Sequence, residues 1–132
     1  MTLYRAGRIP IHAEAFSRLR PKRPRQRSGD HLKFIRSLPC VICGSRGNVQ
    51  AAHIRMASLV HGKRQIGAGE KSSDKWTTPL CSEHHIEQHA GGEAEFWKRH
   101  ALDPFFIAIA LYAHSGDEDA AADVISLART RT

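Results

Sequence analysis

Three cysteines and one histidine have the spacing of a metal site. Cys40 and Cys43 are separated by two residues and followed by Gly44, and 37 residues later Cys81 and His84 repeat the two-residue interval. This interval lets both side chains of a pair reach one ion, the glycine permits a tight turn, and Zn²⁺ favours tetrahedral sulfur and nitrogen ligands. The pattern predicts a structural zinc site. The alternative is three ordinary buried cysteines with histidines on the surface.

The same stretch holds more ligands than one tetrahedral ion needs. His85 and His89 follow His84 and are four residues apart, so on a helix they project from the same face. They could hold a second metal ion, or they could form a solvated polar face. His85 could also replace His84 as the fourth zinc ligand. His53 follows two alanines in an expected strand, where a histidine belongs either to a site or to the core.

The elements that must position these residues are expected to be short. Leu32, Ile35 and Leu38 lie on one side at helical spacing, Asp30 can cap that helix, and Pro39 prevents its continuation. In chain order, the sequence predicts a helix over 30–37, a strand over 48–56, a polar glycine-containing loop over 61–75, an extended segment over 76–81 and a helix over 82–90.

The C-terminal third is expected to be helical. After a helix over 92–101, Asp103 and Pro104 form an N-cap and N1 pair that begins an apolar helix. A last helix follows Asp117, with one apolar stripe formed by Ala121, Val124, Ile125 and Ala128. The expected division is a basic arm over 1–29, a zinc-bearing core over 30–101, and a helical hairpin over 102–132 that packs on the core.

The net charge of +7 is concentrated at the N-terminus. Residues 1–39 carry ten Lys and Arg against two acidic residues, whereas the rest of the chain is nearly neutral. This asymmetry indicates a polyanionic partner such as nucleic acid, although a merely solubilising tail is the alternative. The residues expected to contact phosphates are Arg18, Arg20, Lys22, Arg23, Arg25 and Arg27.

The cellular compartment is expected to be the cytoplasm. The chain has no apolar stretch long enough to cross a membrane and no secretory signal at its N-terminus. In a reducing compartment, an odd number of cysteines favours metal ligation over disulfides.

Taken together, these segments resemble the HNH nucleases, which have a ββα-metal fold. The resemblance covers roughly residues 32–100 and follows the order of a CxxC knuckle, "AAHIR", a short strand ending in "PLC", and a helix with "HH…H". It is greatest to the phage recombination-enhancement, RecA-dependent nucleases and related prophage HNH proteins, which also join a basic N-terminal arm to a zinc-bearing core. The implied fold class is α+β, with a small treble-clef-like core and flanking helices.

The resemblance also implies roles for individual residues. His53 matches the strand histidine that acts as general base, and His85 matches the residue that holds the catalytic divalent ion, Mg²⁺ or Mn²⁺. His89 lies one turn further on.

Two positions depart from the family pattern. Trp76 stands where the family has a residue that orients the base, and Ala52 stands where an acidic metal ligand is common. Asp74 is therefore the candidate to orient His53 or to bind metal, and His89 becomes a more plausible metal ligand.

The resemblance implies a metal-dependent DNA endonuclease with low sequence specificity, and a RecA-type filament is a candidate partner. Lys63, Arg64 and Lys71 of the loop would neutralise phosphates. One alternative is a zinc module that binds nucleic acid without cleaving it. Another is a structural subunit that binds protein through the apolar helix 104–113.

Overall fold

A computed structural model describes residues 26–67 and 69–130, in which two strands and five α-helices form an α+β fold. None of these helices combines the length and apolarity needed to cross a membrane. The elements are α2 (Gly29–Arg36), β1 (Val49–His53), β2 (Thr77–Cys81), α3 (Ser82–Ala90), α4 (Glu93–Arg99), α5 (Pro104–Ala113) and α6 (Glu118–Thr130).

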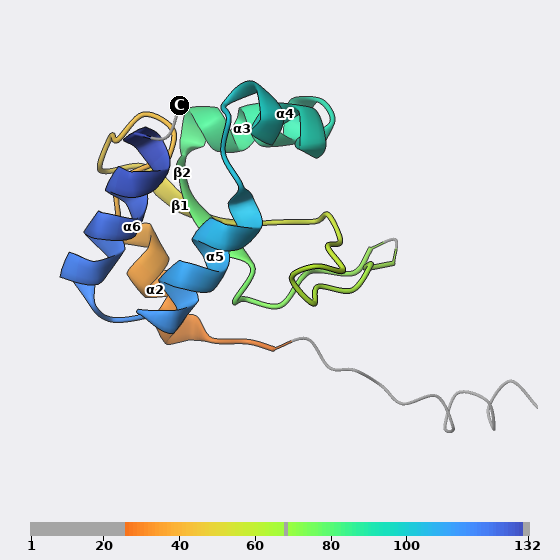
Figure 1. Cartoon of the computed structure of the whole chain (residues 1–132), viewed down its shortest axis with the longest axis horizontal. Helices are drawn as coiled ribbons and strands as arrows, with labels where there is room; N and C mark the ends of the chain where they lie inside the picture. The colour runs from red at the N-terminus through yellow and green to blue at the C-terminus, as the bar shows by residue number, and fades with distance from the viewer. Residues whose placement is uncertain (1–25, 68, 131–132) are drawn as a thin grey trace, which may run out of the picture.

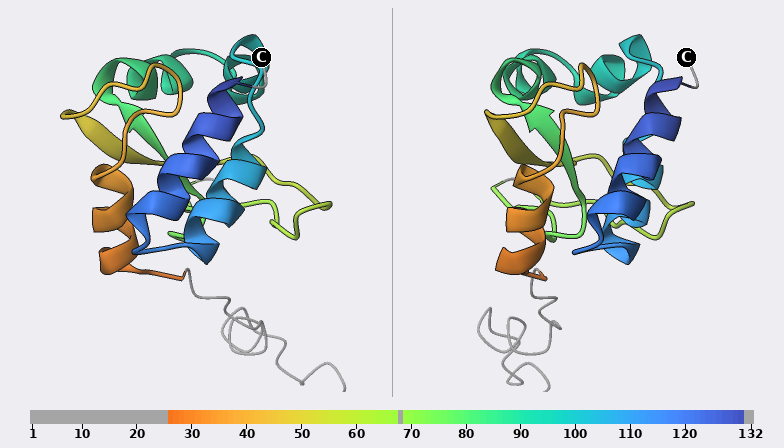
Figure 2. Two further views of the ribbon diagram at one scale, coloured as in Figure 1. Left: turned by 60° about the vertical axis from the view of Figure 1, so that its left-hand side comes forward. Right: turned by 90° about the vertical axis from the view of Figure 1, so that its left-hand side faces the viewer.

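A two-stranded antiparallel sheet lies at the centre of the molecule. β1 pairs with β2 so that His53 is opposite Thr77 and Val49 is opposite Cys81. The last residue of β2 is followed at once by α3, which gives the order strand, strand, helix. α2 contacts both strands, α5 packs on β2, and α6 packs on α5, while α4 lies beside α3 (Figures 1 and 2).

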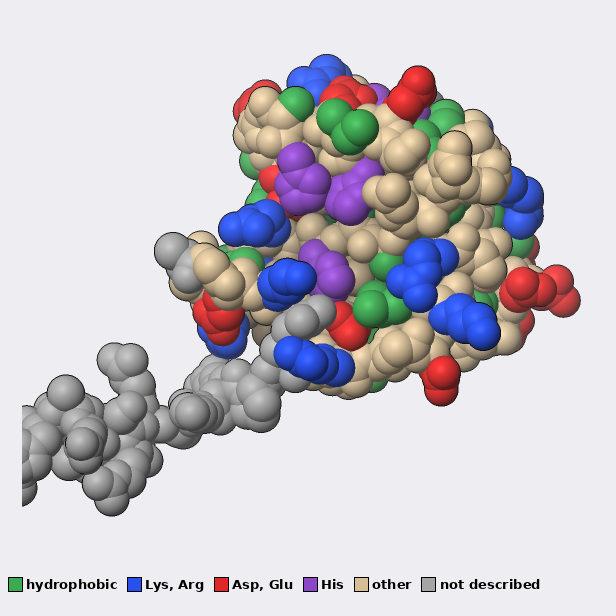
Figure 3. Space-filling view, turned by 180° about the vertical axis from the view of Figure 1, so that it is seen from behind, with side chains coloured by type: hydrophobic (Ala, Val, Ile, Leu, Met, Phe, Trp, Pro, Cys, Tyr) green, Lys and Arg blue, Asp and Glu red, His purple; other side chains and the backbone are tan. Residues whose placement is uncertain are grey.

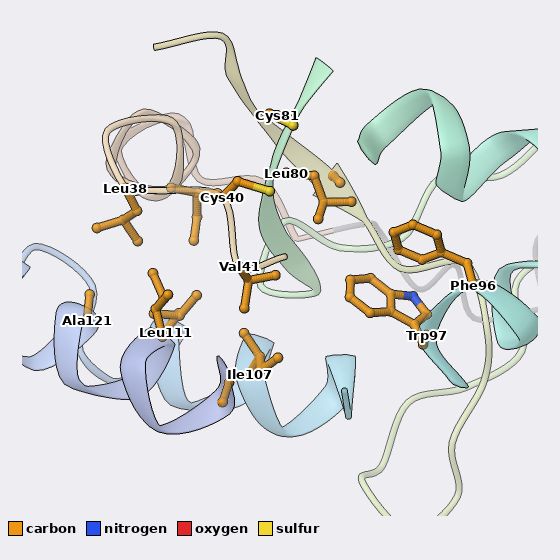
Figure 4. Close-up of a cluster of buried hydrophobic side chains, with 14 residues drawn as sticks. Leu38, Cys40, Val41, Leu80, Cys81, Phe96, Trp97, Ile107, Leu111 and Ala121 are labelled. Atoms are coloured by element: carbon orange, nitrogen blue, oxygen red, sulfur yellow. The ribbon is translucent and has the colours of Figure 1, made fainter. Parts of the chain in front are cut away.

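The main hydrophobic core joins the C-terminal helices to the cysteine turn and to the sheet (Figure 4). Val41, between the first two cysteines, and Leu80 of β2 are fully buried against Ile107 and Leu111 of α5. Cys40 also belongs to this cluster. The cysteine turn is therefore held by apolar packing as well as by its own hydrogen bonds.

The capping residues and the spacing of apolar residues in the sequence predicted the helices and strands correctly, apart from one helix cap and the length of one strand. Asp103 caps α5 as predicted, because its side chain accepts from the N–H groups of Phe105 and Phe106. The cap of α2 is Ser28, and the prediction of Asp30 is wrong. The Ser28 hydroxyl accepts from the N–H three residues on, which is the geometry of an N-cap, whereas Asp30 lies within the first turn. The strand predicted over 48–56 is shorter, at Val49–His53.

The buried face of α2 includes a histidine. His31 is only 1% exposed, shares an Nδ1–Oγ hydrogen bond of 2.7 Å with Ser115, and meets the edge of Tyr112. Burial lowers the pKa of His31, and the negative charge of Asp74 acts in the opposite direction with a smaller effect. The ring is therefore neutral in the folded protein at neutral pH.

We expect His31 to make the protein less stable in mild acid. Because its folded pKa lies below the unfolded value of about 6.5, the unfolded state binds more protons, and stability falls as the pH drops below that value. Urea unfolding between pH 7.5 and 5.5 measures the slope. The variant His31→Gln should be less stable at pH 7.5 but should lose less stability on acidification. Equal pH slopes for the variant and the parent protein would contradict this assignment.

Candidate metal centre and adjoining pocket

Four ligand side chains converge where the cysteine turn meets the start of α3. The sulfur and nitrogen atoms of Cys40, Cys43, Cys81 and His84 all lie within 4.8 Å of one another. The Sγ atoms of Cys43 and Cys81 are 3.9 Å apart, and Nδ1 of His84 is 3.2 Å from the Cys81 Sγ atom. Two sulfurs on a tetrahedral zinc ion, each at about 2.3 Å, would be about 3.8 Å apart. This Cys₃His cluster can bind a metal such as zinc.

The turn that carries Cys40 and Cys43 is stabilised by a backbone hydrogen bond and by the conformation of Gly44. The N–H of Gly44 donates to the carbonyl of Cys40 at 2.8 Å, and Gly44 has a φ of +77° that other residues rarely adopt. A Cβ atom at this position would also lie 2.5 Å from the guanidinium of Arg129. The contact with Ser45 lowers the pKa of Cys43 to about 6, which favours the thiolate that a metal binds, whereas burial raises the pKa of Cys40.

The zinc-ligand candidate His84 has acidic and basic neighbours on its outer side. Its Nε2 atom faces Oε1 of Glu87 at 3.9 Å, one turn further along α3. Glu87 also accepts from Arg99 at 2.8 Å and lies 3.3 Å from the ring of His100. The Arg99 guanidinium lowers the pKa of Glu87, so this carboxylate stays charged. A carboxylate behind a metal-binding imidazole helps to hold the ring in its ligand orientation.

The remaining histidines gather in a separate pocket. A cavity of about 180 Å³ is lined by His53 from β1, by His85 and His89 from α3, and by Lys71 from the long loop. The rings of His85 and His89 have centroids 4.9 Å apart. Figure 3 shows a face of the molecule on which histidine side chains gather among Lys and Arg side chains. His84 and His85 are adjacent in sequence, yet they serve different places, since His84 faces the cysteines and His85 faces this pocket.

Asp74 lies behind His53 and fixes its ring. Nε2 of His53 is 2.9 Å from Oδ1 of Asp74, a residue that is 2% exposed. Because a carboxylate only accepts, the Nε2 atom carries the proton, and Nδ1 is the nitrogen with which the ring would take another. The other oxygen, Oδ2, accepts from the N–H of Ser28 at 2.8 Å. Asp74 is thus placed to orient His53, and it is not among the residues that line the pocket with His85.

His85 is oriented by a residue that the sequence did not point out. Its Nδ1 atom is 2.5 Å from Oε1 of Gln50, a residue of β1. The amide oxygen accepts from the ring, so Nε2 of His85 is the nitrogen that could bind a metal. Burial lowers the pKa of His85, and the charges of His89 and His53 act in the same direction.

The basic residues predicted to contact phosphates have different surroundings. Lys71 is exposed beside the pocket, and Arg27 is exposed at the start of the described chain, whereas Arg18, Arg20, Lys22, Arg23 and Arg25 lie outside the described residues. Arg64 is exposed but paired with Glu70.

The prediction for Lys63 is wrong, because its side chain is 3% exposed and its Nζ atom has no hydrogen-bond partner among residues 26–67 and 69–130. Burial also lowers the pKa of Lys63. The general polarity of the loop gave no sign that this one lysine turns inward.

The two positions that depart from the HNH pattern belong to the core. Trp76 packs with Ile54 and Ala108 in a small second hydrophobic cluster, and Ala52 is fully buried in the main one. Neither residue lines the 180 Å³ cavity. The acidic residue that contacts His53 is Asp74, two residues before Trp76.

One further basic residue lines the pocket and was not singled out from the sequence. Arg55, two residues beyond His53, is exposed and borders both the 180 Å³ cavity and a neighbouring depression of about 440 Å³ that His89 also lines. The backbone N–H of Arg55 donates to Glu93 at 3.0 Å. Its place two residues after the expected strand histidine, on the same side of an extended chain, was a signal that could have drawn attention to it.

Comparisons with known proteins identify relatives without a stated activity. Residues 10–112 match the family described as Protein of unknown function (DUF968). The chain is 34% identical over 80 residues to the Uncharacterized protein YdfU of Escherichia coli (strain K12), an alignment that covers 61% of this chain and 21% of that protein. The aligned part therefore spans about a fifth of the length of this relative. No solved structure matches the chain.

Proposed function

The chain belongs to the family described as Protein of unknown function (DUF968), and we propose that it is a metal-dependent endonuclease of the HNH type that hydrolyses DNA phosphodiester bonds with low sequence specificity. In this proposal, the strand–strand–helix unit of β1, β2 and α3 is a ββα-metal core. Its structural ion is zinc, held by the Cys₃His cluster, and cleavage takes place in the adjoining histidine pocket.

One observation carries the proposal. A histidine on a strand is held through Nε2 by a buried aspartate, and it lines the same cavity as two histidines from the helix that follows the second strand. A histidine oriented by a carboxylate is the usual arrangement of a general base. A module that only binds nucleic acid has no need of such a pair.

The chemistry of the chain's own residues follows from these positions. Nδ1 of His53 accepts a proton from the attacking water, while Asp74 holds the ring in the required tautomer and stabilises the imidazolium that forms. Lys71 and Arg55 place positive charge at the rim, where the phosphate would lie. A bound divalent ion would stabilise the charge that develops on the phosphate and on the leaving oxygen.

The donor set decides which divalent ions fit. His85 and His89 offer imidazole nitrogens, which suit transition-metal ions better than they suit Mg²⁺, an ion that prefers oxygen ligands. Phosphate oxygens and water would supply the remaining ligands. Of the two ions expected, Mn²⁺ therefore fits this pocket better than Mg²⁺.

The direct test is a plasmid-nicking assay on the full chain. We expect nicking with Mn²⁺, weaker nicking with Mg²⁺ and none with EDTA, and a parallel series with a RecA-type filament asks whether that partner is required. DNA binding without cleavage in all of these conditions would favour the non-catalytic zinc module.

Phosphate contact at the pocket rim can be tested with two matched lysines. Lys71→Gln should weaken DNA binding at every sequence and lower the slope of log Kd against log salt by about one, because one fewer counterion is released. Lys33→Gln removes the same charge from the exposed side of α2, which lines neither cavity, and serves as the control. Fluorescence anisotropy at several salt concentrations gives both slopes, and equal slopes for the two variants would argue against a phosphate at the rim.

A further inference from the structure

The segment through which the basic arm enters the core is bonded to the candidate catalytic pair. This segment, residues 26–28, is here called the arm root. The sequence predicts an arm over residues 1–29, which includes this segment. Its hydrogen bonds, however, are made to residues of the folded core. The N–H of Ser28 donates to Oδ2 of Asp74 at 2.8 Å, and the carbonyl of Gln26 accepts from the N–H of Asp74 at 2.9 Å.

Two more hydrogen bonds hold the arm root, and they are made to residues other than His53 and Asp74. The N–H of Gln26 donates to the hydroxyl of Ser73 at 3.0 Å, and its side-chain amide donates to the hydroxyl of Tyr112 at 2.6 Å. The arm root therefore runs beside residues 73 and 74 of the loop and is tied to α5 as well. None of these bonds is local, because the residues concerned are 46 to 86 positions apart in the chain.

The bonds to Asp74 divide between its two carboxylate oxygens. Oδ1 faces His53 and Oδ2 faces the arm root, so the direction of the carboxylate depends on both partners. A backbone N–H is a fixed donor, so a carboxylate that accepts from it is held more firmly than one that accepts from a flexible side chain. If that donor were lost, the carboxylate could rotate, and the tautomer and direction of the His53 ring would be less well defined.

We propose that the arm root is a positioning element of the catalytic pocket, which holds Asp74 and through it the base His53. The arm would then do more than bind DNA, because its basic residues are followed directly in the sequence by the arm root, which contacts Asp74. This inference rests on the proposed nuclease function for its kinetic consequence, but the positioning of His53 can be measured without any cleavage.

The first test separates the arm from its root. A chain lacking residues 1–25 keeps the root, and we expect it to bind DNA more weakly and to keep the His53 tautomer of the full chain. The root itself is tested by the single-turnover cleavage rate at saturating DNA. In the full chain, the double variant Gln26→Ala/Ser73→Ala loosens the root while leaving Asp74, His53 and the Ser28 cap in place. It should keep the DNA affinity and lose about tenfold in that rate, as is usual when a residue behind a functional side chain is removed.

The second test reads the histidine directly. Long-range ¹H–¹⁵N spectra of the full chain should show His53 as the Nε2–H tautomer, and the double variant should show a mixture of tautomers. Ser37→Ala, which removes one hydroxyl hydrogen bond at the other end of α2, is the control and should leave the His53 signals unchanged. Melting curves of the three proteins show whether each variant is folded.

The outcomes distinguish this inference from the proposed function. If the full chain does not cleave DNA but the double variant still changes the His53 tautomer, the nuclease proposal fails and the positioning role stands. If His53 has the same tautomer in the full chain and in the double variant, the arm root does not position it, whatever the activity. An unchanged cleavage rate in the double variant would overturn the kinetic part.

Discussion

Cys81→Ser should lose its metal and unfold. Cys81 supplies one of the four converging ligand atoms, and its sulfur is 3.9 Å from that of Cys43 and 3.2 Å from Nδ1 of His84. The binding free energy of a structural zinc ion is about 10–16 kcal/mol in zinc-finger peptides, and a small domain has only about 5–15 kcal/mol of total stability. Loss of one ligand can therefore remove most of the stability of a core built around the cysteine turn.

Metal analysis and thermal melting followed by circular dichroism measure this effect. The purified parent protein should contain one zinc ion per chain and melt cooperatively, whereas Cys81→Ser should contain little zinc and show no cooperative transition. A parent protein without zinc, or a variant that melts like the parent, would rule out the structural role.

Two adjacent histidines provide the matched comparison. His84→Ala should damage stability in the same way as Cys81→Ser, because the His84 ring faces the sulfurs. His85→Ala should keep the zinc and the melting temperature, because its ring faces the pocket and Gln50. Equal losses of stability in the two variants would contradict the division between a zinc centre and a separate pocket.

His53→Ala should lose cleavage while keeping its fold. The side chain is 25% exposed and lines the pocket, and neither hydrophobic core cluster is built from it. Removal of a general base typically lowers a rate by about 100-fold or more. We therefore expect single-turnover nicking to fall by about that factor, with zinc content, melting temperature and DNA affinity close to those of the parent protein.

Asp74→Asn refines this test. Asparagine has nearly the same shape as aspartate and can still accept from the N–H of Ser28, but it does not stabilise an imidazolium as a carboxylate does. Its cleavage rate should fall by roughly 10- to 100-fold, with the fold retained.

Full nicking activity in His53→Ala would leave the nucleic-acid-binding module as the better account of the pocket.

The sequence by itself determined the features that depend on neighbouring residues. The two CxxC-like intervals and Gly44 specified a four-ligand cluster, because two intervening residues and a tight turn bring paired side chains together wherever the turn lies in the fold. The Asp103–Pro104 pair placed the start of α5 correctly, because capping and a fixed proline φ act within one turn of helix. The four-residue spacing of His85 and His89 was likewise sufficient to put them on one face of α3.

Only the tertiary structure decided which distant side chains meet. Asp74 and His53 are 21 residues apart, and they come together because pairing of β1 with β2 closes the long loop between them. Whether a loop residue is buried or exposed depends on the elements that pack around it. Lys63 is therefore buried, whereas Lys71 lies at the rim of the pocket. The bond between the arm root and Asp74 has the same origin. Such contacts reflect the packing of whole elements, which no local pattern of residues encodes.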